Sequence, residues 1–174
     1  MRWSLLINSF SLLRRQTTSN ATPTTSSTFS LLKNHTMSTP EPISPSTTKV
    51  GWIGTGVIGR SMCAHILEAG YKLTVFNDTI SKAQPLLDQG AHLATSPAEV
   101  AAQSDVVFTI VSFPSDGVLS LLQSRGILAY MTTSDPTLAV EISTAAAAKS
   151  ITSIEAPVSG GDCGARTLSI FAVG

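Results

Sequence analysis

The chain has 174 residues, of which 43% are hydrophobic and 13% charged, and this composition suits a single compact globular domain. Its 11 basic residues balance its 11 acidic residues, so no broad electrostatic field is expected that would attract nucleic acid or anionic lipid. No stretch approaches the roughly 20 consecutive apolar residues of a membrane-spanning helix. Composition and charge therefore argue against nucleic-acid and membrane partners.

The two cysteines, Cys63 and Cys163, are far apart in the sequence. They show neither the close spacing of a metal site nor the pattern of a disulfide framework. Both are predicted to be reduced thiols, and no metal site is predicted.

Residues 1–48 differ in composition from the rest of the chain. The first 40 residues contain four basic residues and no acidic residue, and they are rich in Ser and Thr. This composition predicts a disordered organellar transit peptide, mitochondrial in preference to plastid, followed by a linker rich in Pro, Ser and Thr. A tail without a targeting role is the alternative, and a start at Met37 would produce a cytosolic form.

From residue 49 onward, short apolar runs alternate with helical segments, which is typical of a mostly parallel α/β sheet with helices on both faces. Strands are expected at residues 50–53, 73–76, 91–94, 106–111, 127–131, 151–155 and 168–172. Helices are expected at residues 57–69, 81–88 and 135–148, and one more begins at Ser96, where Glu99 completes a capping box. The run at 106–111 is continuously apolar, so it is expected to be a central strand.

The first expected helix has Met62, Ile66 and Gly70 at four-residue spacing, and these residues are predicted to face the sheet. Gly70 is also predicted to end the helix. This places the helix directly after the first strand and before the second.

Residues 54–59 join the first strand to the first helix and form a G-x-G-x-x-G pattern, here named the glycine loop. Gly54 permits a tight turn, Gly56 lets the backbone approach a pyrophosphate, and Gly59 allows close helix–strand contact. The helix N-terminus adds free N–H groups and a partial positive charge. A Rossmann-type dinucleotide-binding domain over residues 49–174 is predicted, with a glycine-rich turn that binds nothing as the alternative. The predicted cofactor-binding residues of the loop are Gly54, Thr55, Gly56, Val57, Ile58 and Gly59.

The second strand is followed by three polar residues, Asn77, Asp78 and Thr79. They are predicted to meet the adenosine ribose, because the end of this strand lies there in dinucleotide-binding folds. An aspartate accepts hydrogen bonds from ribose hydroxyls and repels a 2′-phosphate. A plain turn is the alternative, since all three residue types are common in turns.

Three segments resemble the β-hydroxyacid dehydrogenase family, and most closely its 3-hydroxyisobutyrate dehydrogenase-like members, which include glyoxylate and succinic semialdehyde reductases. The first is VGWIGTGVIGRSM at residues 50–62, and the second is MTTSDP at residues 131–136. The third is APVSGGDCGAR at residues 156–166, here named the small-residue motif. They occur in the family's order, and the resemblance covers residues 49–174.

The resemblance implies a two-domain enzyme that transfers hydride between NAD or NADP and a small hydroxyacid or aldehyde-acid of the 3-hydroxyisobutyrate, glyoxylate or succinic semialdehyde type. It implies that Phe113 and Pro114 lie near the cofactor and Thr133 near the nicotinamide ribose. It also implies that Ser159, Gly160 and Gly161 bind the substrate carboxylate, where small residues let an anion come close. Without the resemblance, this last segment would be read as a strand-ending turn. The resemblance also leaves open that the protein associates with copies of itself as a homo-oligomer.

The sequence departs from the family pattern at three positions near the site. Asp78 stands where NADP-preferring members have arginine, which favours NAD. The connection 112–126 is shorter than the family's, as if a helical segment had been lost after Asp116. Arg166 runs directly into Thr167, where relatives have additional residues, so the loop beside the small-residue motif is expected to be displaced.

The fourth departure concerns catalysis. Relatives carry a lysine in a following helical domain, where it acts as general acid, but no lysine follows Lys149. No catalytic residue is therefore predicted, and His65 and His92 are interpreted as structural residues. The chain is expected to be truncated before the catalytic helical domain and to have very low turnover alone. The alternative is a non-catalytic dinucleotide-binding or regulatory fragment that pairs with full-length relatives.

Overall fold

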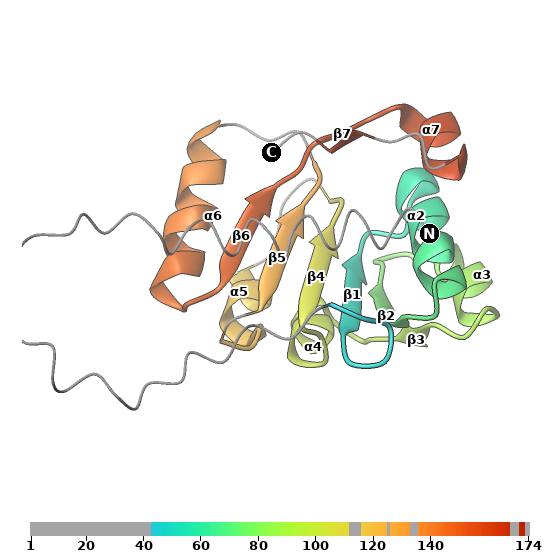
Figure 1. The fold of residues 1–174 in the computed structure, drawn as a ribbon, viewed down its shortest axis with the longest axis horizontal. Coiled ribbons are helices and arrows are strands. Elements are labelled where there is room, and N and C mark those ends of the chain that lie inside the picture. Colours follow the sequence, from blue (N-terminus) through green and yellow to red (C-terminus); the bar gives the residue numbers. More distant parts are fainter. Residues whose placement is uncertain (1–42, 112–115, 125, 133–135, 168–170, 173–174) are drawn as a thin grey trace, which may run out of the picture.

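The computed structural model describes residues 43–111, 116–124, 126–132, 136–167 and 171–172. They form a six-stranded sheet in the order β3-β2-β1-β4-β5-β6, and every neighbouring pair is parallel (Figure 1). This is the strand order of a Rossmann domain, so the predicted fold class is confirmed. The strands are β1 (Lys49–Ile53), β2 (Lys72–Phe76), β3 (His92–Leu93), β4 (Val106–Thr109), β5 (Ile127–Tyr130) and β6 (Thr152–Glu155).

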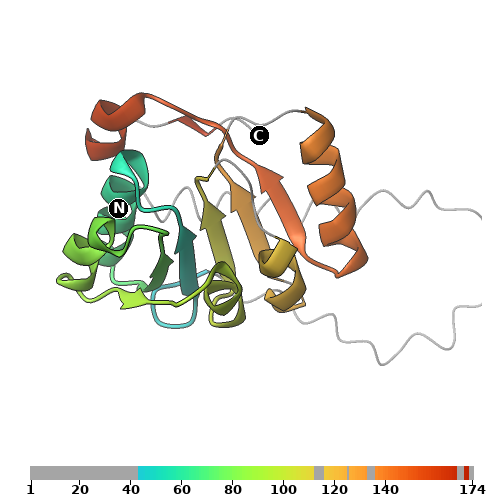
Figure 2. The same cartoon turned by 180° about the vertical axis from the view of Figure 1, so that it is seen from behind.

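Helices cover both faces of the sheet, as the front and back views show (Figures 1 and 2). One face carries α2 (Val57–Glu68), η1 (Ile80–Lys82) and α3 (Gln84–Leu87), and the other carries α4 (Pro97–Ala102), α5 (Asp116–Leu121) and α6 (Pro136–Ala148). After β6 come β7 (Val158–Ser159), α7 (Gly161–Thr167) and β8 (Phe171–Ala172). The strands β7 and β8 pair with each other, antiparallel, outside the main sheet.

The sheet divides the core into two apolar clusters. Alternate residues of β1 serve the two sides: Trp52 packs in the cluster under α2, and Ile53 packs in the cluster under α4, α5 and α6. All four residues of β4 are buried, which confirms that this run is a central strand covered on both faces. The two clusters hold the carboxyl ends of β1, β2 and β4 at one edge of the sheet, where the glycine loop begins.

Helix α2 confirms most of what the four-residue spacing predicts. Met62 and Ile66 are buried against the sheet. Gly70 is exposed, so the prediction that it faces the sheet is wrong, because the helix has already ended at Glu68. Gly70 has φ +86°, and its amide donates to the Leu67 carbonyl, so it terminates the helix as predicted.

The single helix predicted at 81–88 is wrong, because the structure has two short helices, η1 and α3. Pro85 lies in the first turn of α3. A proline has no N–H to donate to a carbonyl in the preceding turn, so it begins a new helix more readily than it continues an old one. The strand predicted at 106–111 is also shorter than expected and ends at Thr109.

The N-terminus of α4 confirms Ser96 as the N-cap and modifies the predicted capping box. The Glu99 amide donates to Ser96 Oγ at 3.1 Å. The Glu99 carboxylate accepts from the amide and hydroxyl of Thr95, at 2.7 and 2.6 Å, and not from the Ser96 amide. These bonds lower the pKa of Glu99 below its ordinary value.

Two helices were not predicted from the sequence. The connection 112–126 contains α5, whose Val118 is buried between α4 and the sheet. Helix α7 occupies the small-residue motif and was not predicted, since Gly161 and Gly164 disfavour a helix. Packing stabilises α7 instead, because Ala165 is buried in the cluster beneath α2. The predicted strand 168–172 is represented by β8, which pairs with β7 and does not extend the parallel sheet.

The two thiols are expected to differ sharply in reactivity. Cys63 is fully buried on α2, and this burial raises the pKa of its thiol, whereas Cys163 is exposed on α7. Iodoacetamide at neutral pH should therefore add one adduct to the native protein, at Cys163, and two after denaturation. Intact-mass measurement followed by peptide mapping checks this. Rapid labelling of Cys63 in the native protein would contradict the packing of α2.

Candidate dinucleotide-binding site

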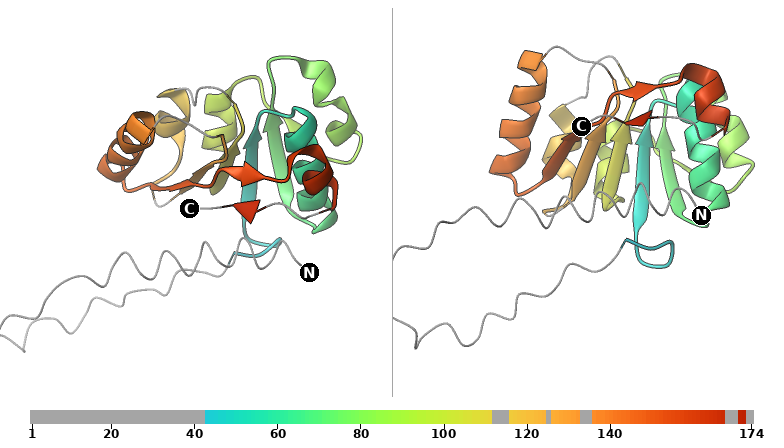
Figure 3. Two further views of the ribbon diagram at one scale, coloured as in Figure 1. Left: turned by 90° about the horizontal axis from the view of Figure 1, so that it is seen from above. Right: turned by 45° about the horizontal axis from the view of Figure 1, so that its top comes forward.

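The glycine loop leaves β1 at Ile53 and enters α2 at Val57, at the carboxyl edge of the sheet. The strand order reverses between β1 and β4 at this edge, and α/β folds bind ligands at such a reversal. The left panel of Figure 3 looks down onto this edge, with α2 and α7 together at one end and α6 at the other. The loop is thus at the position where a Rossmann domain holds a dinucleotide.

The three glycines of the loop differ in what surrounds them. Gly54 has φ +96°, and a Cβ added there would lie 2.6 Å from the Ile110 carbonyl oxygen. A Cβ at Gly59 would overlap the Gly54 carbonyl oxygen. A Cβ at Gly56 would meet no atom within 4 Å. Gly54 and Gly59 are therefore required by packing within the chain, whereas the space beside Gly56 is open to a ligand.

The N-terminus of α2 offers donors without acceptors of their own. Gly56 is the N-cap, in an extended conformation, and no side chain caps the helix. The first intrahelical bond runs from the Arg60 amide to the Gly56 carbonyl, so the amides of residues 57–59 precede the helical bonding pattern. The first turn carries no acidic residue, and Val57 is 54% exposed. A helix terminus of this kind binds anions.

Asn77 connects the end of β2 to the glycine loop. Its Oδ1 accepts a hydrogen bond from the Thr55 amide at 2.9 Å, and its Nδ2 donates to the Thr79 carbonyl at 3.0 Å. Asp78 and Thr79 are exposed beside it. The structure thus brings the three residues of the β2 terminus next to the loop, and the Thr55 amide is already bonded within the chain.

Two features at the glycine loop were not predicted from the sequence. The indole Nε1 of Trp52, which is buried in β1, donates to the Gly54 carbonyl at 3.0 Å. The Thr55 hydroxyl is buried and has no hydrogen-bond partner within the described part of the chain. The first of these features could have been predicted from the tryptophan two residues before Gly54, because a buried indole N–H needs an acceptor close by.

The small-residue motif spans β7, the turn after it and most of α7. Ser159 ends β7, and Gly160 and Gly161 follow with φ +115° and +55°. Both conformations favour glycine. Ser159, Gly160 and Gly161 are all exposed, so their hydroxyl and backbone groups are accessible to a ligand.

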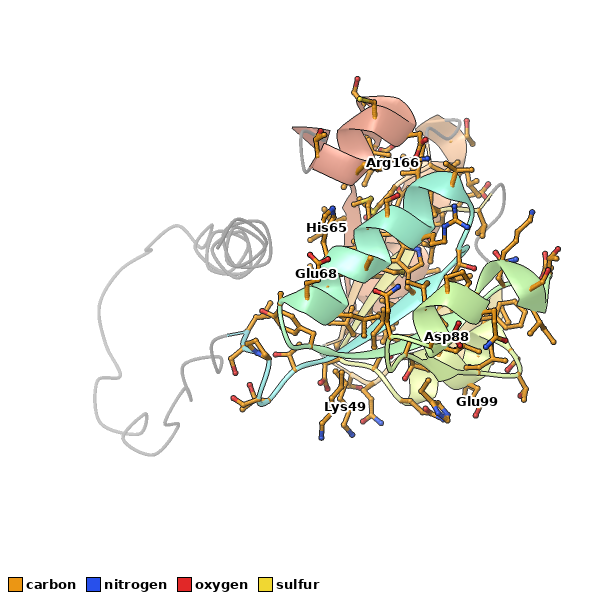
Figure 4. All side chains as sticks on the ribbon, turned by 90° about the vertical axis from the view of Figure 1, so that its right-hand side faces the viewer. Lys49, His65, Glu68, Asp88, Glu99 and Arg166 are labelled. Atoms are coloured by element: carbon orange, nitrogen blue, oxygen red, sulfur yellow. The ribbon has the colours of Figure 1, made fainter. Side chains whose placement is uncertain are left out.

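His65 holds α7 against α2. Its Nε2 lies 3.2 Å from the carbonyl oxygens of both Ala165 and Arg166, and its Nδ1 lies 3.3 Å from Glu68 Oε2. Figure 4 labels His65 and Glu68 on α2 with Arg166 on the neighbouring α7. An ion pair of 2.7 Å between Arg166 and Asp162 lies within α7 and lowers the pKa of Asp162. These contacts, together with the burial of Ala165, stabilise α7, which forms the second half of the small-residue motif.

Three predicted residues, Phe113, Pro114 and Thr133, lie outside the described residues. Their neighbours reach the same edge of the sheet: the Thr132 hydroxyl donates to the Val111 carbonyl at 2.7 Å, which ties the end of β5 to the end of β4.

The described residues contain no group of three or more His, Cys, Asp or Glu side chains that could hold a metal ion. Within the same residues, no helix is both long enough and apolar enough to cross a membrane.

Comparison with known families shows what the chain is related to. Residues 49–174 match the family described as the NAD binding domain of 6-phosphogluconate dehydrogenase. The chain belongs to this family. The NAD-binding domain therefore has the dinucleotide-binding fold that the glycine loop and the strand order predict.

The NAD-binding domain also resembles individual dehydrogenases. It is 60% identical, over 76% of the chain and 43% of the relative, to an Arabidopsis thaliana protein named "Probable 3-hydroxyisobutyrate dehydrogenase-like 1, mitochondrial". A Mycobacterium tuberculosis 3-hydroxyisobutyrate dehydrogenase, solved with L-serine, superposes with a TM-score of 0.66 at 26% identity, covering 71% of the chain and 44% of that structure. An imine reductase of Myxococcus stipitatus in complex with NADP+ has a TM-score of 0.59 at 28% identity, covering 64% and 41%. The chain spans less than half the length of each relative, and the resemblance to 3-hydroxyisobutyrate dehydrogenase-like proteins is confirmed.

Proposed function

We propose that the NAD-binding domain binds NAD or NADP through the glycine loop. We further propose that the whole protein transfers hydride between the nicotinamide and a small β-hydroxyacid or aldehyde-acid. The observation that carries the first part is the open space at Gly56 beside the uncapped N-terminus of α2. A diphosphate fits this surface, since it is anionic and the helix terminus presents free amides. The names of the relatives favour a dehydrogenase over the non-catalytic alternative.

Different residues are proposed to bind different parts of the dinucleotide. The amides of residues 56–59 take the diphosphate, and the β2 terminus, Asn77 to Thr79, takes the adenosine ribose. Phe113, Pro114 and Thr133 complete the cofactor site by family resemblance. The bound nicotinamide supplies or accepts the hydride, and the residues of this domain bind and orient the cofactor.

Calorimetric titration of the purified chain with NAD and with NADP tests the binding. Saturable binding of at least one dinucleotide, with one site per chain, is the expected result. A folded chain that takes up neither dinucleotide would contradict the proposal.

The small-residue motif is proposed to bind the substrate carboxylate. Ser159 offers a hydroxyl, and the glycines at 160 and 161 leave their backbone amides uncovered by side chains. The α2–α7 contact at His65 supports this role, because it fixes the motif on the side of the fold that carries the glycine loop.

Asp78 is proposed to favour NAD over NADP, because its exposed carboxylate would face the 2′-phosphate of NADP. Asp78→Arg is expected to shift the ratio of the two Kd values towards NADP by roughly tenfold to more than a hundredfold, since one charge-assisted hydrogen bond contributes about 1.5 to 3 kcal/mol. Glu141→Arg, the same charge change at an exposed position on α6, is the matched control and should leave the ratio unchanged. Tighter binding of NADP than of NAD by the wild type would refute the preference.

A mitochondrial location is proposed from the basic, acid-free first 40 residues and from the name of the Arabidopsis relative, which describes that protein as mitochondrial. Residues 1–42 lie outside the described part of the chain. A fluorescent protein fused after residue 48 should enter mitochondria, and a fusion that begins at Met37 should remain in the cytosol. Plastid import of the first fusion would correct the assignment.

A further inference from the structure

Trp52 occupies an unusual place for a core residue, because it touches both the sheet and the glycine loop. Its side chain is completely buried, and its ring stacks on Phe108 of the neighbouring strand with 5.3 Å between ring centroids. Its indole nitrogen faces the loop, and a Cβ added to Gly59 would lie 2.9 Å from it. The ring is thus held rigidly by the core while its single donor faces the loop.

The acceptor of that donor is the carbonyl of Gly54, 3.0 Å away. The same peptide unit carries the Thr55 amide, which donates to Asn77 Oδ1 at 2.9 Å. Both polar groups of the Gly54–Thr55 peptide are therefore bonded to side chains, one from β1 and one from the end of β2. Because a peptide unit is planar, these two bonds fix its rotation.

Fixing this peptide matters because of the residues on either side of it. Gly54 has φ +96° and, lacking a Cβ, has more conformational freedom than any other residue type. Gly56 follows directly, with open space beside it. If this glycine loop became ordered only when a ligand binds, the conformational entropy lost by the loop would weaken binding.

We propose that Trp52 is a positioning residue of the dinucleotide site: its indole N–H, together with Asn77, holds the Gly54–Thr55 peptide so that the amides of residues 56–59 face the diphosphate before it binds. This rests on the proposed function of the glycine loop. Trp52 touches no part of the dinucleotide and acts through Gly54.

Trp52→Phe tests the proposal, because it retains an aromatic ring in the core and removes the donor. The variant should bind ADP-ribose and the preferred dinucleotide about three- to tenfold more weakly, the effect of one net hydrogen bond. Equal losses for the two ligands are expected, because ADP-ribose contains the diphosphate but no nicotinamide. Phe108→Leu is the matched control: it disturbs the ring stack, leaves the indole donor in place, and should keep the Kd of ADP-ribose within twofold of the wild type.

A second measurement on the wild type uses the fact that the chain has two tryptophans, Trp3 and Trp52. In a spectrum of ¹⁵N-labelled indoles, the Trp52 Nε1–H should exchange slowly with solvent and shift when ADP-ribose is added. This readout does not depend on the folding of a variant.

Each possible outcome of these measurements is decisive. Weaker binding by Trp52→Phe with no loss in Phe108→Leu supports the proposal. Unchanged binding by Trp52→Phe, or an equal loss in Phe108→Leu, overturns it while leaving the proposed function intact. If the wild type binds no dinucleotide, the proposed function fails. If the Trp52 indole proton exchanges with solvent within the dead time of the measurement, the hydrogen bond to Gly54 is absent and the positioning role is refuted, whatever the binding results are.

Discussion

Replacing Gly59 with alanine is expected to lower the free energy of unfolding by about 2 to 3 kcal/mol, although alanine is the better helix former. The added Cβ would overlap the Gly54 carbonyl oxygen, which is a backbone atom and cannot move aside cheaply. It would also lie 2.9 Å from the Trp52 indole nitrogen that bonds to the same carbonyl. Helix α2 would have to move away from β1, and urea denaturation measures the result.

For a domain of this size the same change should lower the melting temperature by about 5 to 10 °C. Dinucleotide binding should weaken as well, because the displaced helix carries the amides of the site. A Gly59→Ala variant as stable as the wild type would show that the contact between α2 and the glycine loop is looser than the structure has it.

Replacing Gly56 with alanine should separate binding from stability. Its backbone, with φ −63° and ψ −170°, is accessible to alanine, and a Cβ there meets nothing within 4 Å. Because alanine restricts the unfolded chain, stability should remain equal or rise by about 0.4 to 1 kcal/mol. The Cβ would project into the space proposed for the diphosphate and break one or more charge-assisted hydrogen bonds. The Kd for dinucleotide should therefore rise roughly tenfold to a hundredfold.

Calorimetric titration and urea denaturation of Gly56→Ala and Gly59→Ala, side by side, check both predictions. The pair is informative because each variant adds one methyl group to the same loop. Unimpaired binding by Gly56→Ala would place the diphosphate elsewhere and remove the main support for the proposed function.

Local sequence patterns predicted most of the elements of the fold. The apolar run at 106–111 indicated a central strand, and β4 is buried on both faces. The glycine spacing at 54–59 indicated the turn from strand to helix, and the structure gives each glycine a distinct environment. Ser96 indicated the start of α4. These features are local because residues a few positions apart determine them.

The errors occurred where local preference and packing disagree. Helix α7 contains two glycines that disfavour a helix, and it forms because Ala165 is buried beneath α2 and His65 lies beside its last carbonyls. The predicted helix after β2 divides at Ala83, just before Pro85, a residue that is tolerated in the first turn of α3 but not in the interior of a longer helix. The last strand pairs with β7 because its partner is decided by the connection through α7.

The succession of the six parallel strands along the chain, the position of the glycine loop between β1 and α2, and the polar end of β2 follow from the amino-acid sequence alone, because each depends on neighbours along the chain. The bonds that shape the site do not. The Thr55 amide meets Asn77, 22 positions away, only after β2 has paired with β1. Trp52 and Gly54 are near neighbours along the chain, but the indole faces the Gly54 carbonyl in a ring position set by the packed core. A periodic pattern encodes which face of an element is buried, whereas the partner of a buried donor is selected by the packing of elements distant in the chain.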